Sequence, residues 1–335
     1  MTKEKIFLAY GCSFTWGHGL QYYDWIEKSE MSGDEIKEYL LTELHGSHYQ
    51  WANLHSKITQ RDMESMRKLR YIDLISQKLD MDYITDVTNG GDNYSSITSI
   101  ETILNQDQWN PESSDYRVWG PPHWMDETTG DGVTGLQFHE SGSKARPDFT
   151  LQNDKLLNRE IDFVILQLTH PDRNLFTGEE LRMTPDREID NIKGHFNCWM
   201  DQYMGKNFGL GNRDRDEMYV SIMEDTLDRV RDIHTICNAR NIKLFVWSYP
   251  GDIAYIFKDE PYFLKIPTGD KEYNSYDELV ADNPEFCLGH PHTEYTGELL
   301  GDLGHCGVTD EHPSKEFHKL ISEIILDSLE SEDIV

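Results

Sequence analysis

The sequence predicts an α/β fold, in which helices cover both faces of a mostly parallel sheet in three layers. Apolar runs of strand length recur at four places along the chain, and segments with helix-like apolar spacing lie between them. Polar or glycine-containing turns follow these runs. Parallel strands need crossover connections, so strands that alternate with helices favour this class of fold.

Two strands and two helices are predicted in the first part of the chain. The apolar run 6–10 ends in a glycine turn, and a second run follows at 82–87. Leucine and isoleucine recur at helical spacing over 68–79. The Gly-rich turn at 88–93 leads into a helix over about 94–104, which completes a strand, turn and helix in succession.

The strongest strand signal lies at 161–168, where the side chains are nearly all apolar, as in a strand that is covered on both faces. A helix is predicted over 218–237, and it leads to a further strand at 242–247. An amphipathic helix over 317–329 completes the predicted fold.

The domain organisation follows from the length and from the gaps between these elements. A chain of 335 residues permits one large domain with insertions, and we expect a single domain over 1–335. Three segments lack periodicity and are rich in proline, glycine, aromatic or acidic residues. These predicted irregular insertions are 106–158, 176–214 and 250–308.

Charge excludes several classes of partner. The chain has 31 Lys and Arg against 61 Asp and Glu, a net charge of −30, whereas nucleic-acid binding needs a cationic surface. The same charge disfavours anionic membranes, and no apolar stretch is long enough to span one. The five cysteines form no Cys-x-x-Cys pair, and the first apolar run is too short for a signal peptide. We therefore expect a cytoplasmic protein in a reducing compartment.

Two polar clusters carry residues for nucleophilic catalysis. Ser13 follows the first predicted strand, and Asp310 and His312 precede the last predicted helix. A serine nucleophile needs an imidazole base and a group that orients it. The ends of parallel strands meet at one edge of a sheet, so these clusters could converge there. The alternatives are a helix-capping role for Ser13 and a surface or packing role for His312.

Read in chain order, four short blocks resemble the SGNH (GDSL-like) hydrolase family. The blocks are Gly11-Cys12-Ser13, Gly90-Gly91-Asp92-Asn93, Leu168-Thr169-His170-Pro171 and Asp310-Glu311-His312-Pro313-Ser314. They extend over nearly the whole chain, and most of the sequence between them is unmatched. The resemblance implies a flavodoxin-like three-layer α/β/α sandwich, with Ser13 as the nucleophile, His312 as the base and Asp310 as its partner.

The resemblance also implies an oxyanion hole. In the family the glycine of the second block donates its backbone N–H, which here is Gly90 or Gly91, beside the N–H of Ser13. The third block of the family has an asparagine donor, and His170 stands in its place. An imidazole N–H can donate as an amide does, and Asn93 could substitute for it.

One further departure concerns the carboxylate. Family members usually have Asp three residues before the His, where this chain has Thr309, and Asp310 lies only two residues before His312. Several members are thought to work as a Ser-His dyad, so the departure weakens the catalytic assignment of Asp310 more than that of His312.

The activity that the resemblance implies is serine-dependent ester hydrolysis, of the esterase or acetylesterase type, through an acyl-enzyme intermediate. The expected partner is a small-molecule or glycan ester, with no nucleic acid, no membrane, no cofactor and no metal. Arg173 could anchor a substrate carboxylate, or it could form a surface salt bridge.

Two other classes of function remain open from the sequence. Nitrogen, sulfur and oxygen donors between 290 and 312 could hold zinc, namely His290, His292, His305 and Cys306 with Asp302, Asp310 and His312 nearby. The third class is a degenerate member of the family that acts as a binding or structural module. Tryptophan and tyrosine in the predicted insertions suit sugar stacking or a protein contact.

Overall fold

The computed structural model describes part of the 335-residue chain in detail. The described residues are 4–17, 19–20, 22–23, 26–27, 31–32, 34–35, 38, 68–85, 93–105, 159–171, 212–289, 300–304 and 310–332. The chain divides into two compact units that alternate along the sequence. The first unit comprises Met1–Ser13, Ile84–Trp119 and Leu156–Tyr276, and the second comprises Phe14–Tyr83, Gly120–Lys155 and Asp277–Val335.

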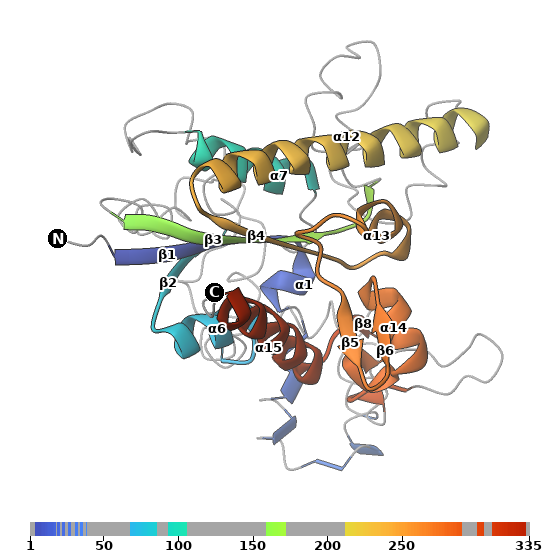
Figure 1. The fold of residues 1–335 in the computed structure, drawn as a ribbon. Helices are drawn as coiled ribbons and strands as arrows, with labels where there is room; N and C mark the ends of the chain where they lie inside the picture. The colour runs from blue at the N-terminus through green and yellow to red at the C-terminus, as the bar shows by residue number, and fades with distance from the viewer. Residues whose placement is uncertain are drawn as a thin grey trace, which may run out of the picture. The chain divides into compact units, whose positions relative to one another are not determined.

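A four-stranded sheet with the order β2-β1-β3-β4 forms the centre of the fold (Figure 1). Its strands are β1 (Glu4–Tyr10), β2 (Asp82–Thr85), β3 (Arg159–Leu168) and β4 (Lys243–Ser248). β3 is parallel to both β1 and β4. This parallel sheet with its helices confirms the predicted α/β class and fits a three-layer α/β/α sandwich.

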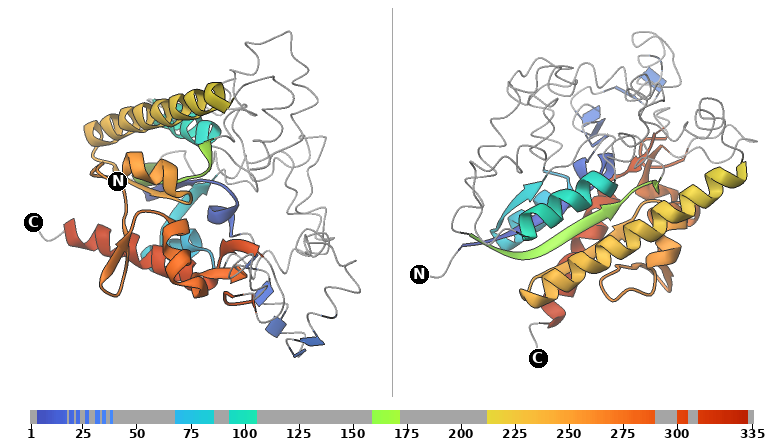
Figure 2. Two further views of the ribbon diagram at one scale, coloured as in Figure 1. Left: turned by 90° about the vertical axis from the view of Figure 1, so that its right-hand side faces the viewer. Right: turned by 90° about the horizontal axis from the view of Figure 1, so that it is seen from above.

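Helices of the first unit cover one face of the sheet. They are α7 (Asn93–Leu104), α12 (Asn212–Ala239) and α13 (Gly251–Phe257), and Figure 2 shows α7 and α12 side by side over the strands. Alternate strand residues such as Leu8, Leu166 and Val246 point into this core and are fully buried. Arg229 connects α12 to α7, because its Nη2 lies 2.7 Å from Oε2 of Glu101 on α7.

The opposite face of the same strands is also buried. Phe7 of β1 stacks on Phe163 of β3 with ring centroids 4.6 Å apart, and Phe163 meets Phe245 of β4 edge-on at 6.0 Å. Ile165 and Trp247 are fully buried on this face too. Burial on both faces explains why β3 has an almost continuous apolar sequence.

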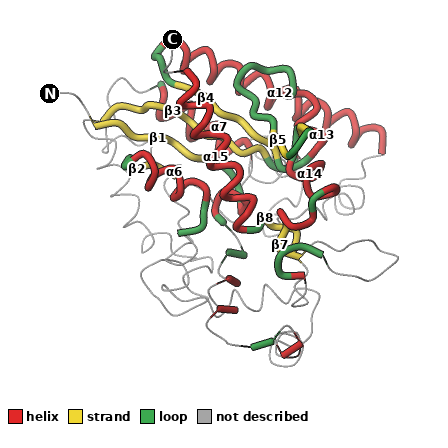
Figure 3. Tube along the Cα trace, turned by 60° about the horizontal axis from the view of Figure 1, so that its bottom comes forward, coloured by secondary structure: helices red, strands yellow, loops and turns green. Residues whose placement is uncertain are grey.

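The second unit contains a helix pair and a small hairpin. α6 (Tyr71–Leu79) packs against α15 (Lys315–Glu332), and Figure 3 shows the two helices near each other. The hairpin pairs β7 (Cys287–Gly289) with β8 (Asp310–Pro313) in antiparallel register. Asp310 and His312, the second candidate cluster, therefore lie in a short strand before the last helix.

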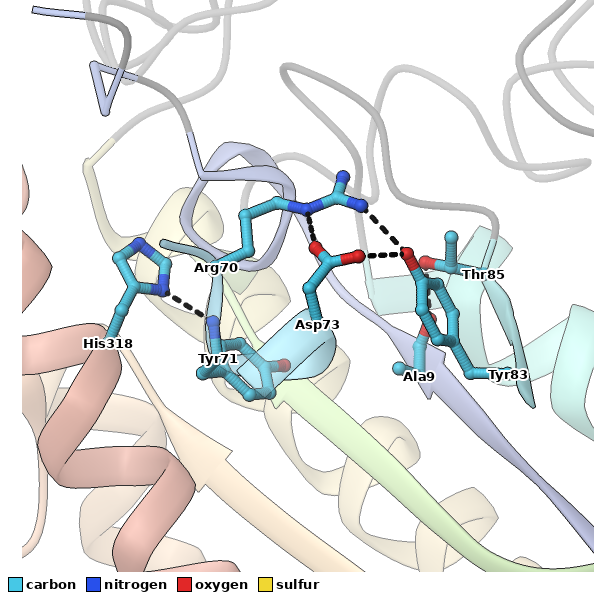
Figure 4. Close-up of polar contacts among 7 residues, drawn as sticks. All are labelled: Ala9, Arg70, Tyr71, Asp73, Tyr83, Thr85 and His318. Atoms are coloured by element: carbon cyan, nitrogen blue, oxygen red, sulfur yellow. Dashed lines mark hydrogen bonds and ion pairs between the residues drawn. The ribbon is translucent and has the colours of Figure 1, made fainter. Parts of the chain in front are cut away.

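A partly buried ion pair holds the start of α6. Arg70 Nε lies 2.6 Å from Asp73 Oδ2, and the hydroxyl of Tyr83 accepts from Arg70 and donates to Asp73 at 2.9 and 2.7 Å (Figure 4). Burial alone would lower the pKa of the Arg70 guanidinium, but Asp73 and Tyr83 together raise it. The side chain of Arg70 thus has a fixed position.

His318 of α15 is fully buried beside this ion pair. Its Nδ1 accepts from the backbone N–H of Tyr71 at 3.3 Å, and the two rings stack (Figure 4). Burial, and then the charges of Arg70 and His312, lower the pKa of His318 to about 3. The folded protein therefore keeps this imidazole neutral.

This gives a prediction for the pH dependence of stability. Below pH about 6.5 an unfolded chain protonates this histidine and the folded chain does not, so the free energy of unfolding falls as pH drops toward the folded pKa. In His318→Gln, the slope of that free energy between pH about 6 and 4 should be smaller by up to about 1.4 kcal/mol per pH unit. Urea unfolding at several pH values measures the slope, and equal slopes would contradict the assignment.

The structure differs from two expectations, the irregularity of 250–308 and the start of the long helix before β4. The segment 250–308 was expected to be irregular, but its described part holds α13, the hairpin of β5 (Ile266–Thr268) with β6 (Lys271–Tyr273), α14 (Tyr276–Asp282), the 3₁₀ helix η5 (Pro284–Phe286) and β7. Elements of three to seven residues are too short to give a periodic signal. α12 begins at Asn212, before the predicted start and inside the expected insertion 176–214. The expected insertion 106–158 lies outside the described residues.

Candidate active site

Ser13 lies directly beyond the carboxyl end of β1, as the sequence predicts. It is the first residue of the short helix α1 (Ser13–Trp16), and its side chain is buried. Its Oγ donates to Cys12 Sγ at 3.9 Å. The position at the exit of a parallel strand is the one where open α/β sheets place their sites.

A glutamine that the sequence interpretation passed over holds the residue before Ser13. Gln167 of β3 is buried, and its Oε1 accepts from the backbone N–H of Cys12 at 2.8 Å. Its Nε2 donates to the carbonyl oxygen of Leu168 at 2.6 Å. The available signal was a single polar residue within the apolar run 163–168.

Asn93 joins the start of α7 to the end of β3. Its side-chain amide makes two hydrogen bonds with the backbone of Thr169: Nδ2 donates to the carbonyl oxygen and Oδ1 accepts from the N–H, both at 2.8 Å. The side chain is fully buried. This pairing joins the start of α7 to the backbone that follows β3.

His170, the residue at the asparagine position of the third block, follows directly. Its ring meets the ring of Tyr249 edge-on, with centroids 4.9 Å apart. The N–H of Tyr249 donates at 3.0 Å to the Leu168 carbonyl, the same oxygen that Gln167 binds. Hydrogen bonds therefore connect the exits of β1, β3 and β4 with the start of α7.

His312 lies in the second unit, in β8. Its ring is half-buried and packs on Phe14, with centroids 4.9 Å apart and the ring planes at 37°. Phe14 is the residue that follows Ser13 in the chain. Asp310 is the first residue of the same strand.

The junction between β8 and α15 is held at several points. Ser314 N–H donates to the Phe286 carbonyl, and Ser314 Oγ donates to the Glu285 carbonyl, both at 2.9 Å. The hydroxyl of Tyr23 accepts from Lys315 N–H at 3.1 Å and donates to Asp302 at 2.5 Å. These contacts lie within three residues of His312, so its backbone has little freedom.

Several expected site residues lie outside the described residues. They are Gly90, Gly91 and Arg173 of the hydrolase interpretation, and His290, His292, His305 and Cys306 of the zinc interpretation. Within the described ranges, no three His, Cys, Asp or Glu side chains gather as a metal ion would require. No helix in that part of the chain has the length and apolar character to cross a membrane.

The chain matches no family model and no curated protein. Among solved structures it is similar to an acetyl xylan esterase (Est2A) from the rumen bacterium Butyrivibrio proteoclasticus, with 12% sequence identity and a TM-score of 0.35. The similarity covers 99% of this chain and 65% of the esterase, so the chain spans less than two thirds of that protein's length.

Proposed function

We propose that the protein is a serine-dependent ester hydrolase of the SGNH type, with Ser13 as the nucleophile and His312 as the general base. The observation that carries the proposal is the packing of the His312 ring on Phe14, the chain neighbour of Ser13. The second support is the position of Ser13 at the carboxyl end of a parallel strand.

The reaction divides into two steps. Ser13 Oγ attacks the ester carbonyl while its proton passes to His312, and the tetrahedral intermediate then collapses to an acyl-serine. The leaving alcohol takes the proton from His312. A water molecule then attacks the acyl-serine while its proton passes to His312, and His312 returns that proton to Ser13 Oγ as the acid leaves.

The developing oxyanion needs hydrogen-bond donors. The candidates are the backbone N–H of Ser13 and of Gly90 or Gly91, with His170 or Asn93 in the role of the family's asparagine. Asp310 would orient His312, and Arg173 would bind a carboxylate on the substrate. The substrate class is an ester of a small molecule or a carbohydrate.

A serine-directed fluorophosphonate tests the proposal, because the reagent reacts with a base-activated hydroxyl. The folded protein should acquire one adduct, which peptide mass spectrometry should place on Ser13, and Ser13→Ala should not be labelled. Ser99→Ala, which changes a buried serine of α7, is the matched control and should label like the wild type. A folded wild-type protein that neither labels nor hydrolyses aryl esters would favour the binding module instead.

A further inference from the structure

Gln167 is a buried polar side chain in an apolar strand, and it makes hydrogen bonds to backbone groups of two different segments. A buried amide needs hydrogen bonds, and Gln167 finds an N–H on Cys12 and a carbonyl on Leu168. One partner can only donate and the other can only accept, so a flipped amide would lose both bonds. The orientation of the side chain is therefore fixed.

The Gln167 amide acts where the backbone ladder between β1 and β3 stops. The last paired residues are Tyr10 and Leu166, and the chain leaves the sheet over the next two residues. Cys12 is fully buried, so its N–H needs an acceptor that the ladder no longer supplies. Gln167 Oε1 supplies it, which lets the chain turn away from the strand without leaving a buried donor unsatisfied.

We propose that Gln167 is a positioning residue for the nucleophile, an inference that rests on the proposed function. The bond from Cys12 N–H to Gln167 fixes the Gly11–Cys12 peptide, one residue before Ser13, and thereby restricts the direction in which Ser13 leaves the turn. It also occupies the Cys12 N–H with an acceptor of the fold itself. The bond to Leu168 holds the amide itself, together with the Tyr249 N–H on the same oxygen.

The first variant is Gln167→Met, which has a similar length and no acceptor for the Cys12 N–H. A small misplacement of a catalytic group costs on the order of a hundredfold in rate, so we expect kcat and the rate of fluorophosphonate labelling to fall about ten- to a hundredfold. KM should stay within about twofold, because the change affects chemistry and not substrate binding. Thr226→Val is the matched control, since it removes a buried side-chain bond to backbone within α12 and should leave both rates near wild type.

The second variant, Gln167→Glu, adds a pH readout, which is measured only over the pH range in which circular dichroism shows the variant to be folded. A protonated carboxyl can accept from Cys12 N–H and donate to the Leu168 carbonyl, as the amide does, whereas an ionised carboxylate has no donor for Leu168. Burial raises the pKa of such a carboxyl. The activity of Gln167→Glu relative to wild type should therefore fall as pH rises, while the relative activity of Gln167→Met should not change with pH.

The outcomes separate the inference from the proposed function. Wild-type labelling at Ser13, together with a Gln167→Met rate equal to that of Thr226→Val, would overturn the role of Gln167 and leave the hydrolase standing. Absence of wild-type labelling would overturn both. If Gln167→Met does not fold, the pH dependence of Gln167→Glu decides, and a relative activity that is flat with pH would count against the inference.

Discussion

Replacing His312 with Ala is expected to lower kcat for ester hydrolysis by a factor on the order of 10⁶, because the nucleophile loses its base. KM should change little, since the imidazole acts on the reacting hydroxyl. The measurement is steady-state hydrolysis of a short-chain aryl ester, with fluorophosphonate labelling as a second readout. Labelling of the variant should be lost as well.

The control for this substitution is His234→Ala. His234 lies on α12, where its ring packs on Tyr262 with centroids 4.5 Å apart, and it has no part in the proposed chemistry. Its rate should stay within about twofold of wild type. Near-normal hydrolysis by His312→Ala would remove the base from the proposal.

The rate of ester hydrolysis by Asp310→Ala should lie between the rates of His312→Ala and His234→Ala. If Asp310 orients His312, its loss lowers the rate severely but less than the loss of His312, because a Ser-His dyad retains general-base catalysis. A rate equal to wild type would show that another group orients the imidazole.

Gly17→Ala is expected to destabilise the protein by about 3 kcal/mol, the largest stability effect that we predict. Gly17 has φ +83°, and a Cβ there would lie 2.5 Å from Cγ and 2.9 Å from Cδ of Arg70. These atoms belong to the stem of a side chain whose guanidinium is bound to Asp73 and Tyr83, so they cannot easily move away. Chemical denaturation with circular dichroism measures the loss.

Gly269→Ala provides the matched control. Gly269 also has a positive φ, +59°, but no atom lies within 4 Å of its Cβ position. The substitution there costs only the backbone strain, about 1 kcal/mol. A Cβ at Gly17 would also lie 2.9 Å from Leu20 Cδ1. The difference between the two variants therefore measures the overlap with Arg70 and Leu20, and equal losses would show that both side chains move aside.

The sequence predicted the strands and long helices where burial is one-sided or complete over many residues. β3 is the clearest case, because a strand that is buried on both faces has an almost continuous apolar sequence, and few other elements have one. The start of α12 was missed because residues 212–217 are almost all charged or polar and give no apolar period. The hairpin of β5 and β6 has strands of three residues, which is too short for alternation to be read.

The candidate site could be predicted only in part. Ser13 and His312 came from short blocks of sequence that resemble a family, and their roles stay predictions. Gln167 and Tyr23 were not singled out, because their partners Cys12 and Asp302 are 155 and 279 residues away and no local pattern connects them. Tertiary contacts of this kind give a residue its role without a signal in its neighbourhood.

The long separation between Cys12 and Gln167 has a consequence for biosynthesis. A ribosome adds about 5 to 20 residues per second, so the acceptor for the Cys12 N–H is made on the order of ten seconds after its donor. Closing so long a loop costs entropy that only docking of β3 against β1 can offset. A nascent chain that ends before β3 therefore lacks the turn that orients Ser13, and the candidate nucleophile becomes ordered only after most of the sheet has been translated.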